Sequence, residues 1–445
     1  MMFDKIEYAI KVGLKEGAQQ VEAYLNRSQS KSVSAEKGEL KMAVSKRIQG
    51  LGIRVLYEGG IGFAYTIDLS EKAIEETVKK AIKVAKARGK DPYYKTFPGK
   101  TTFPKVSGIF FKETVETSLD TLVETVSHMV EVARDYDRRI TSVSASFGVR
   151  YGEKFIGNSL GIESSEKYSS ASLSVFAVIE EASEMTSGYE VQAERNIKKL
   201  NSEEVAQKAA KMAVDLLHPK KIETAKVDVL LKPIALMSLL GPTLVNAVRA
   251  DNVQEKRSFL VGKLGKQIAV EELTIVDNPL KEEGLASRSF DDEGVASKRV
   301  TIIENGILKS YLHNSYTAQR EGVENTGHAA RGYSSEPSIS PSNFIIFVKE
   351  EKDYEKMIEE VKKGVVANSV IGAHTANPIT GEFSVALGEC FYIENGEIKY
   401  PVKQAMIGGN ILDLLTKITA IGKDRRQLGS IETGTLYFKE VTVSG

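Results

Sequence analysis

Stretches with apolar residues at helical spacing alternate along the chain with stretches in which every second residue is apolar. Residues 3–15 and 70–87 show the three- and four-residue spacing of amphipathic helices, and Ser70 is well suited to cap the second. Residues 21–65 alternate instead, with a tight turn at Glu58-Gly-Gly60. The first 90 residues therefore predict an N-terminal α/β unit.

A second unit follows a linker marked by prolines, residues 91–110. The apolar spacing over residues 112–134 predicts one long amphipathic helix, and residues 140–185 alternate as strands do. A helix over residues 202–217, capped by Ser202 and ended before Pro219, closes this middle α+β unit at about residue 220.

The remainder, residues 221–445, is rich in short strands and turns. Asn305-Gly306 and Asn395-Gly396 each lie between alternating apolar residues, which is the pattern of a two-residue β-hairpin. We therefore expect an α+β protein with an N-terminal unit (1–90), a linker (91–110), a middle unit (111–220) and a strand-rich antiparallel C-terminal domain (221–445).

Composition excludes several classes of protein. A chain of 445 residues exceeds the roughly 250–300 residues that one hydrophobic core supports, and 60 Lys and Arg balance 60 Asp and Glu. A net charge of zero provides no field that would attract nucleic acid. The first residues lack the apolar core of a secretory signal, and no apolar stretch approaches the roughly 20 residues of a membrane span. We expect a cytoplasmic protein with no direct contact to nucleic acid or membrane.

The second half of the chain carries separated motifs in a fixed order. They are Gly241-Pro-Thr-Leu-Val-Asn-Ala-Val-Arg-Ala-Asp251, Ser258-Phe-Leu-Val-Gly-Lys-Leu-Gly265, Leu273-Thr-Ile-Val-Asp-Asn278, Ser289-Phe-Asp-Asp-Glu-Gly-Val-Ala296, Ile303-Glu-Asn-Gly-Ile-Leu-Lys-Ser-Tyr-Leu312 and Asn325-Thr-Gly-His-Ala-Ala-Arg-Gly332. With these motifs the sequence resembles the TldD/TldE (PmbA) metalloprotease family, members of which are called modulators of DNA gyrase. The resemblance implies a TldD/PmbA-like fold over nearly the whole chain.

Within that family, the TldD branch holds zinc with His-Glu-x-x-x-His and a late cysteine. The two histidine positions fall on Val245 and Ala250, the glutamate falls on Asn246, and the cysteine would lie near residues 427–431, where this chain has none. Aliphatic side chains offer no lone pair to zinc, and an amide is a poor base for activating water. The sequence therefore resembles the TldE branch, which lacks the metal site.

This resemblance implies a role in a pair of subunits. The chain would have no cofactor and no activity alone, and would act in a TldD/TldE zinc metallopeptidase on unfolded peptides. Zinc is then expected in a TldD-like partner carrying His-Glu-x-x-x-His. The alternative is a self-associating homodimer that binds peptides without cleaving them.

Other metal donors of the third unit lack a short ligand spacing. His313, His328, His374 and Cys390 are scattered, so we expect hydrogen-bonded or surface histidines and a small buried cysteine rather than a relocated metal site. The acid-rich segment 289–294 lacks the ligand spacing of a calcium loop and predicts a charged surface turn.

The polar segment 325–332 offers candidates for binding. Asn325, His328 and Arg331 are candidates for a wall of the substrate cavity or for the partner interface, and Arg331 could hold a peptide carboxylate in a bidentate fork. A solvated turn is an equally good interpretation of the same residues.

Overall fold

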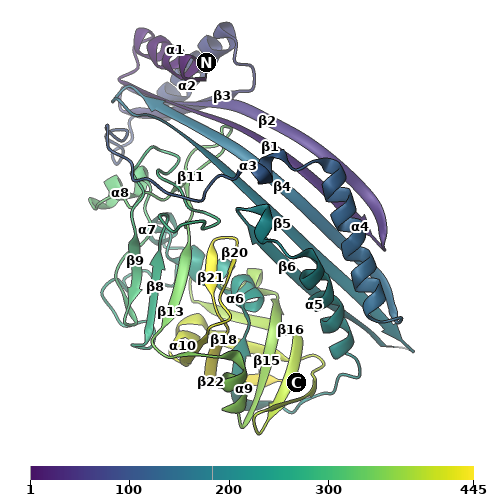
Figure 1. Ribbon diagram of the computed structural model, residues 1–445. Helices are drawn as coiled ribbons and strands as arrows, with labels where there is room; N and C mark the ends of the chain where they lie inside the picture. The colour runs from purple at the N-terminus through teal and green to yellow at the C-terminus, as the bar shows by residue number, and fades with distance from the viewer. Residues whose placement is uncertain (1, 183) are drawn as a thin grey trace.

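A long, curved antiparallel sheet forms the first half of the protein (Figure 1). The computed structural model describes residues 2–182 and 184–445. The strand order is β3-β2-β1-β4-β5-β6, with β1 (Gln20–Glu36), β2 (Glu39–Tyr57), β3 (Gly60–Thr66), β4 (Ile140–Asn158), β5 (Glu163–Glu181) and β6 (Glu184–Glu194). Because β1 pairs with β4, the first two units predicted from the sequence share one sheet.

Helices cover one face of this sheet in two groups. Near one end lie α1 (Met2–Lys15) and α2 (Glu71–Arg88), and along the other half lie α3 (Lys112–Glu116), α4 (Leu119–Tyr136) and α5 (Ser202–Asp215) (Figure 1). The alternation of β1 explains both groups, because Val21 and Ala23 enter the core beneath α1 and α2, and Val33 and Ala35 enter the core beneath α4. Glu22 and Tyr24 face the other way, toward Arg331 of the C-terminal domain.

Two helix boundaries differ from the prediction. The long amphipathic helix predicted over residues 112–134 is present only from Leu119 onward. The chain leaves the helical conformation at Thr117 and Ser118, and α4 then begins with the Ser118 hydroxyl accepting from the Thr121 amide at 3.0 Å. Asn201, not Ser202, caps α5. In both places a side-chain oxygen accepts from an N–H group of the first turn, which has no acceptor within the helix, and apolar periodicity does not register such a cap. The Ser70 cap of α2 is confirmed.

The C-terminal domain contains two larger sheets that enclose a shared apolar core. One has the order β10-β9-β8-β13-β21-β20, with β8 (Leu273–Asp277), β9 (Val300–Glu304), β10 (Ile307–Leu308), β13 (Phe344–Val348), β20 (Arg426–Leu428) and β21 (Ile431–Thr433). The other has the order β14-β19-β22-β18-β16-β15-β7, with β17 beside β16; its strands are β7 (Ala225–Leu231), β14 (Glu351–Lys352), β15 (Lys363–Ile371), β16 (Glu382–Glu394), β17 (Glu397–Pro401), β18 (Met406–Asn410), β19 (Ile418–Gly422) and β22 (Leu436–Ser444).

Short elements connect these sheets. They are α6 (Pro233–Leu240), the π-helical turn η2 (Gly241–Val245), α7 (Ala250–Gln254), α8 (Ser315–Glu321), the strand pair β11 (Ala329–Ala330) and β12 (Ser338–Ile339), α9 (Tyr354–Glu359) and α10 (Ile411–Leu415). Both predicted Asn-Gly hairpins are confirmed, since Asn305 and Asn395 have positive φ angles of 48° and 51° at the turns after β9 and β16. None of the described helices combines the length and the hydropathy needed to cross a membrane.

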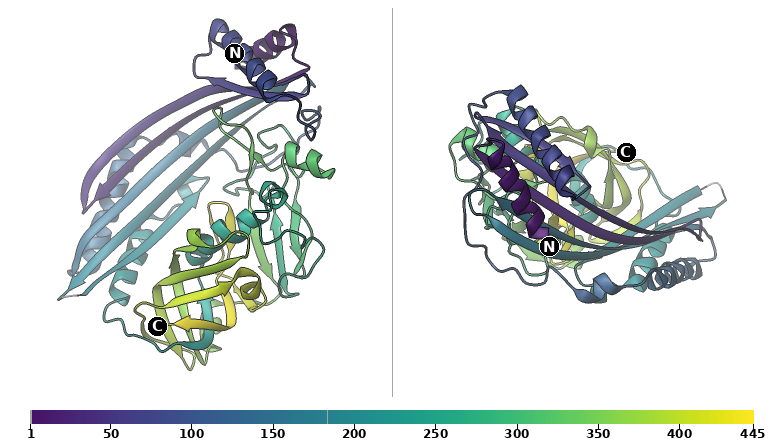
Figure 2. Two further views of the ribbon diagram at one scale, coloured as in Figure 1. Left: turned by 180° about the vertical axis from the view of Figure 1, so that it is seen from behind. Right: turned by 90° about the horizontal axis from the view of Figure 1, so that it is seen from above.

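The C-terminal domain packs against the sheet face that carries no helices. Seen from above, this domain and helix α4 lie on opposite sides of the sheet (Figure 2). Two glycines of β2 allow the approach, because a Cβ atom at Gly50 would lie 2.2 Å from the ring of Tyr333, and one at Gly52 would lie 2.4 Å from the Tyr333 carbonyl oxygen. Backbone of the segment after β11 therefore rests directly on the long sheet.

Candidate functional site

The segment expected to correspond to the family's ligand helix does not form one continuous helix. It runs through α6, the turn η2 and then α7, with extended backbone at Arg249. Val245 and Ala250 are buried in the apolar core of the C-terminal domain, while exposed Asn246 donates its amide to the Pro242 carbonyl at 3.2 Å. Two aliphatic side chains and an engaged amide supply no donor set for zinc, so the residues at these positions do not fit that ion.

The segment expected to match the late cysteine, residues 427–431, forms the turn between β20 and β21. Helix α6 packs against both strands, so this turn lies close to the segment that contains Val245 and Asn246. The Gln427 side chain in this turn is held by hydrogen bonds, because it donates to Asn343 Oδ1 at 2.7 Å and accepts from the Leu285 amide at 3.2 Å.

The alternative metal donors lie in different surroundings. His313 is buried, its Nδ1 has no hydrogen-bond partner within the described ranges, and burial lowers its pKa. His374 is exposed, whereas Cys390 is buried, and burial raises the pKa of its thiol to about 12. Over residues 2–182 and 184–445, no three His, Cys, Asp or Glu side chains gather into a group that could hold a metal ion.

Asn325 and His328 point into the C-terminal domain. The Asn325 amide donates to Ser315 Oγ at 3.0 Å, and its oxygen accepts from the Gly327 amide at 2.9 Å. His328 is fully buried, and both of its ring nitrogens are hydrogen-bonded, Nε2 with Asp277 Oδ1 at 2.9 Å. These side chains hold the loop in place, and neither His328 nitrogen is left for a ligand.

Arg331 joins the C-terminal domain to the long sheet. Its side chain is 1% exposed, pairs with Glu22 of β1, and lies over the Tyr24 ring with Cζ 4.6 Å from the centroid. Arg54 of β2 donates to both Glu22 carboxylate oxygens at 2.9 Å and to Glu293 at 2.8 Å. Although burial alone would raise it, the two guanidinium groups hold the pKa of Glu22 below its ordinary value. The candidate loop is thus one side of a buried interdomain ion-pair network.

The acid-rich segment 289–294 belongs to the same joint, and the prediction of a charged surface turn is wrong. Asp291 and Glu293 are fully buried. Asp291 accepts from the amides of Glu293 and Val295 at 2.9 Å and of Ala329 at 3.0 Å, while Glu293 pairs with Arg54. Burial, and then the charge of Glu293, raise the pKa of Asp291 to about 7. The partners of these acids come from distant segments, which local spacing does not reveal.

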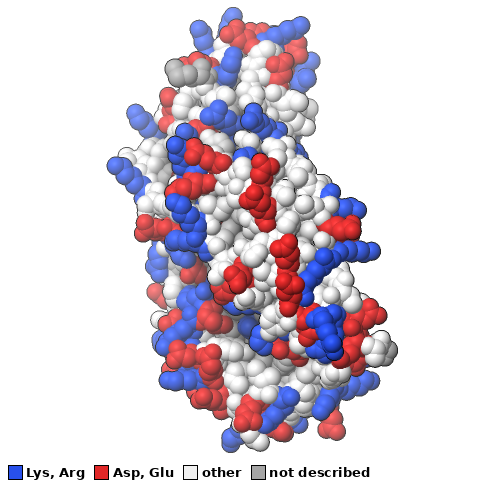
Figure 3. Space-filling view, turned by 45° about the vertical axis from the view of Figure 1, so that its right-hand side comes forward, with Lys and Arg blue, Asp and Glu red and all other residues white. Residues whose placement is uncertain are grey.

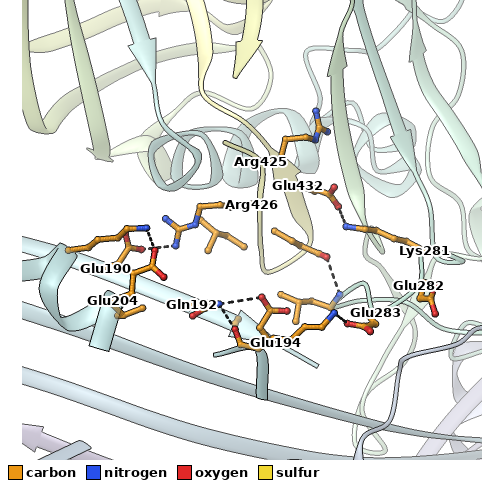
Figure 4. A pocket seen from close by; sticks show the side chains of 17 residues that line it. Glu190, Gln192, Glu194, Glu204, Lys281, Glu282, Glu283, Arg425, Arg426 and Glu432 are labelled. Carbon is orange, nitrogen blue, oxygen red and sulfur yellow. Dashed lines mark hydrogen bonds and ion pairs between the residues drawn. The ribbon is translucent and has the colours of Figure 1, made fainter. Parts of the chain in front are cut away.

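A cleft separates β6 and α5 from the C-terminal domain. It encloses a cavity of about 500 Å³, lined on one side by residues of β6 and α5 and on the other by residues 281–285, β20 and β21 (Figure 4). Glu190 and Arg426 face each other across it, with Arg426 Nη2 2.6 Å from the Glu190 carboxylate (Figure 4). An adjoining cavity of about 670 Å³ shares these two residues and has aromatic walls, among them Tyr354 and Phe391. No motif marks these residues in the sequence.

The outer edge of β6 is occupied by side chains rather than by another strand. The Tyr189 amide donates to Glu389 at 2.8 Å, the Val191 amide donates to Glu190 at 2.8 Å, and the Val191 carbonyl accepts from Arg426. Burial raises the pKa of Glu389. Edge strands accept extended peptides as an added strand, and side-chain partners can give way to a peptide backbone. The cleft can therefore hold an extended peptide through main-chain hydrogen bonds.

Surface charge does not favour one kind of charged partner on the face drawn in Figure 3. Basic and acidic side chains are intermixed there, without a continuous field of one sign.

Comparisons with known proteins agree along the whole chain. Models of the PmbA/TldA metallopeptidase family match residues 21–85 (domain 1), 112–217 (central domain) and 224–445 (C-terminal domain). An uncharacterised protein of Methanocaldococcus jannaschii is 33% identical over 98% of both chains, and metalloprotease PmbA of Escherichia coli O157:H7 is 31% identical over 97% of this chain and 93% of its own. The crystal structure of TldE from Thermococcus kodakarensis superposes with a TM-score of 0.92 at 26% identity, covering 99% of this chain and 100% of that one.

Proposed function

The chain belongs to the PmbA/TldD metallopeptidase family, and we propose that it is the TldE-like subunit of a TldD/TldE zinc metalloprotease complex acting on unfolded peptides. The side chains at Val245, Asn246 and Ala250 support this role, because they provide neither zinc ligands nor a general base. No other metal-binding group among the described residues offers a replacement. We therefore assign zinc and the catalytic base to a TldD-like partner carrying His-Glu-x-x-x-His.

In this proposal the chain contributes binding rather than chemistry. A peptide lying along the outer edge of β6 would bond to backbone groups at Tyr189 and Val191, which requires no particular peptide sequence. Fixing an extended peptide in this way removes much of its freedom before it reacts, and such positioning lowers the barrier to cleavage in the partner.

A homodimer that binds peptides without cleaving them is the second candidate. Phe176, Met185 and Ile371 remain 42%, 73% and 67% exposed, and all three line a further cavity of about 580 Å³. Exposed apolar side chains gathered in this way are typical of an interaction surface. Such a surface suits a second copy of the chain as well as a TldD-like partner.

Zinc content and cleavage measured together distinguish the two candidates. The untagged chain is purified alone and after copurification with a His-Glu-x-x-x-His partner, and each sample is analysed for zinc, molar mass and cleavage of an unfolded peptide. We expect zinc and cleavage only in the sample containing the partner. About one tightly held zinc per chain in the protein purified alone would refute the assignment of zinc to the partner. A stable homodimer that does not bind the partner would favour the peptide-binding homodimer.

A pair of variants tests the role of β6. Val191→Pro removes the outward amide while leaving the strand in place, because proline is tolerated on the free side of an edge strand. We expect kcat/KM of the complex to fall about tenfold, corresponding to one lost hydrogen bond of about 1.4 kcal/mol, without loss of zinc or of assembly. Val191→Thr keeps the amide and is the matched control; equal activity of the two variants would exclude peptide binding along this edge.

A further inference from the structure

A separate, smaller cavity lies between the long sheet and the C-terminal domain. It measures about 280 Å³, many times the roughly 30 Å³ that one water molecule takes up in the liquid. Strands β1, β4 and β5 form one wall, and Arg195, which directly follows β6, contributes to the lining. Residues 285–288, Asp292 and residues 331–332 form the opposite wall.

Cationic side chains outnumber acidic ones around this cavity. The two acids, Glu166 and Asp292, both lie near the buried ammonium of Lys154, at 3.6 and 3.3 Å. Arg331 also contributes to the lining and is paired with Glu22, which lies outside it. These pairs account for every carboxylate of the lining among the described residues.

Three further cations of the lining have no such partner. Arg150, Arg195 and Arg288 form no ion pair with any described carboxylate. Among the described residues, the Arg150 side chain donates only to the Tyr168 hydroxyl, at 3.4 Å, and the Arg288 side chain only to the Gly327 carbonyl, at 3.3 Å. The Nε atom of Arg288 is buried and has no hydrogen-bond partner in the part of the chain that the structure describes. No described carboxylate therefore contacts these three guanidinium groups, although Glu166 acts on Arg195, and Asp277 and Asp291 act on Arg288, through space.

Arg195 is the most informative of the three. It is 3% exposed, and three backbone carbonyls hold its guanidinium in a fixed plane: those of Ser169 at 3.1 Å, Gly284 at 3.0 Å and Ser287 at 3.2 Å. Burial lowers its pKa to about 10. Carbonyl groups orient a guanidinium but do not cancel its charge. Glu166 attracts Arg195 only through space and lies near Lys154, and a buried ion without a counter-ion in contact is unfavourable.

The aromatic part of the lining is also built in. Tyr168 lies opposite Gly152 in the register of β4 and β5, and a Cβ atom at Gly152 would come 2.1 Å from the Tyr168 Cζ. The glycine thus leaves room for the ring to cross the sheet and for its hydroxyl to reach Arg150. A residue with any side chain at position 152 would displace the ring.

We propose that this cavity binds an oxyanion ligand carrying two or more negative charges, either a phosphate group or closely spaced carboxylates. Guanidinium groups bind both in planar, bidentate geometry, and the unpaired arginines supply the charge that such a ligand neutralises. Two sources carry this chemistry, a free small anion and the acidic C-terminal end of a peptide. Neither source requires a TldD-like partner, so the site can be tested on the chain alone.

Isothermal titration calorimetry on the full-length chain, at constant ionic strength, tests the site. The titrants are inorganic phosphate, a short peptide ending in Asp-Asp with a free carboxylate, and a peptide of equal length ending in Asn-Asn as an amide. We expect saturable binding of phosphate or of the acidic peptide, and none of the neutral one. Arg150→Gln should weaken it about tenfold, because Arg150 is one of the ligating charges and supports no buried backbone.

Arg47→Gln is the matched control, since Arg47 is an exposed arginine of the same sheet outside the cavity. Binding of phosphate alone would identify a free anion as the source, and binding of the acidic peptide alone would identify a chain end. If neither phosphate nor the acidic peptide binds saturably, the proposed site is wrong. It is also wrong if Arg150→Gln and Arg47→Gln weaken anion binding equally. The outcome is independent of zinc or peptidase activity.

Discussion

Replacing Arg54 by methionine should weaken the joint between the long sheet and the C-terminal domain more than any surface change. Arg54 is 4% exposed and bridges two fully buried carboxylates, those of Glu22 and Glu293. Without it, Glu22 retains Arg331, but Glu293 retains, among the described residues, only the Ser315 amide, at 2.8 Å. Removing one partner from a buried ion pair costs about 3–5 kcal/mol, because the other charge stays buried.

An exposed ion pair across the same joint provides the control. Arg88 of α2 pairs with Glu336, and their side chains are 50% and 41% exposed. Because water screens such a pair, Arg88→Met should cost about 0–1 kcal/mol. Methionine is used in both variants because it retains most of the apolar contact, which for Arg54 includes the Phe97 ring 5.0 Å away.

Two measurements are needed because a chain of several units need not unfold in one step. Urea unfolding gives the free energy of unfolding, and hydrogen exchange in β1, β2 and residues 325–336 reports opening of the joint itself. We expect Arg54→Met to lower the free energy of unfolding and to accelerate hydrogen exchange in these segments, whereas Arg88→Met should stay close to wild type in both. If the two variants differ by less than about 1 kcal/mol and exchange alike, the buried network does not hold the domains together.

Three further predictions concern single sites. Burial and Glu293 raise the pKa of Asp291 from 3.8 to about 7, so the folded chain keeps this carboxyl protonated at pH values where the unfolded chain does not. The resulting stabilisation is lost as the pH rises through about 7. Glu293→Gln should therefore make the fall of Tm with rising pH less steep. Buried Cys390, its thiol pKa raised to about 12, should resist a thiol reagent at about pH 8 until guanidinium unfolds the chain. Gly241→Ala should raise the free energy of unfolding by ~0.5–1 kcal/mol, because Gly241 has helical φ and ψ of −56° and −61° and an added Cβ meets no atom within 4 Å.

Each of these has a contrary result. The comparison of Glu293→Gln with wild type cancels His313, whose lowered pKa gives stability that falls as the pH drops through its range, and equal pH slopes would refute the coupling of Asp291 to Glu293. Rapid modification of Cys390 in the folded protein would show that the core around β16 opens. A destabilised Gly241→Ala would show that the π-helical turn depends on glycine.

The sequence by itself determined the local elements and the family. Apolar periodicity located α1, α2 and α5, the Asn-Gly pairs fixed two hairpins, and ordered motifs of the second half indicated PmbA/TldD membership, which the family models confirm. These features depend on residues close together in the chain, so local sequence patterns are enough to predict them. The absence of ligand chemistry at Val245 and Ala250 was also readable, because it follows from residue type alone.

Only the tertiary structure decided what the charged residues do. The sequence predicted a surface turn at residues 289–294 and left open whether Arg331 meets a substrate, a partner or water, whereas the fold buries Asp291 and Glu293 and brings Arg331 to Glu22, 309 positions away. The cleft along β6 and the arginine-lined cavity likewise arise where the long sheet meets the C-terminal domain. Burial and ion pairing depend on which distant segments pack together, and that information lies in the packing of the units rather than in any local pattern.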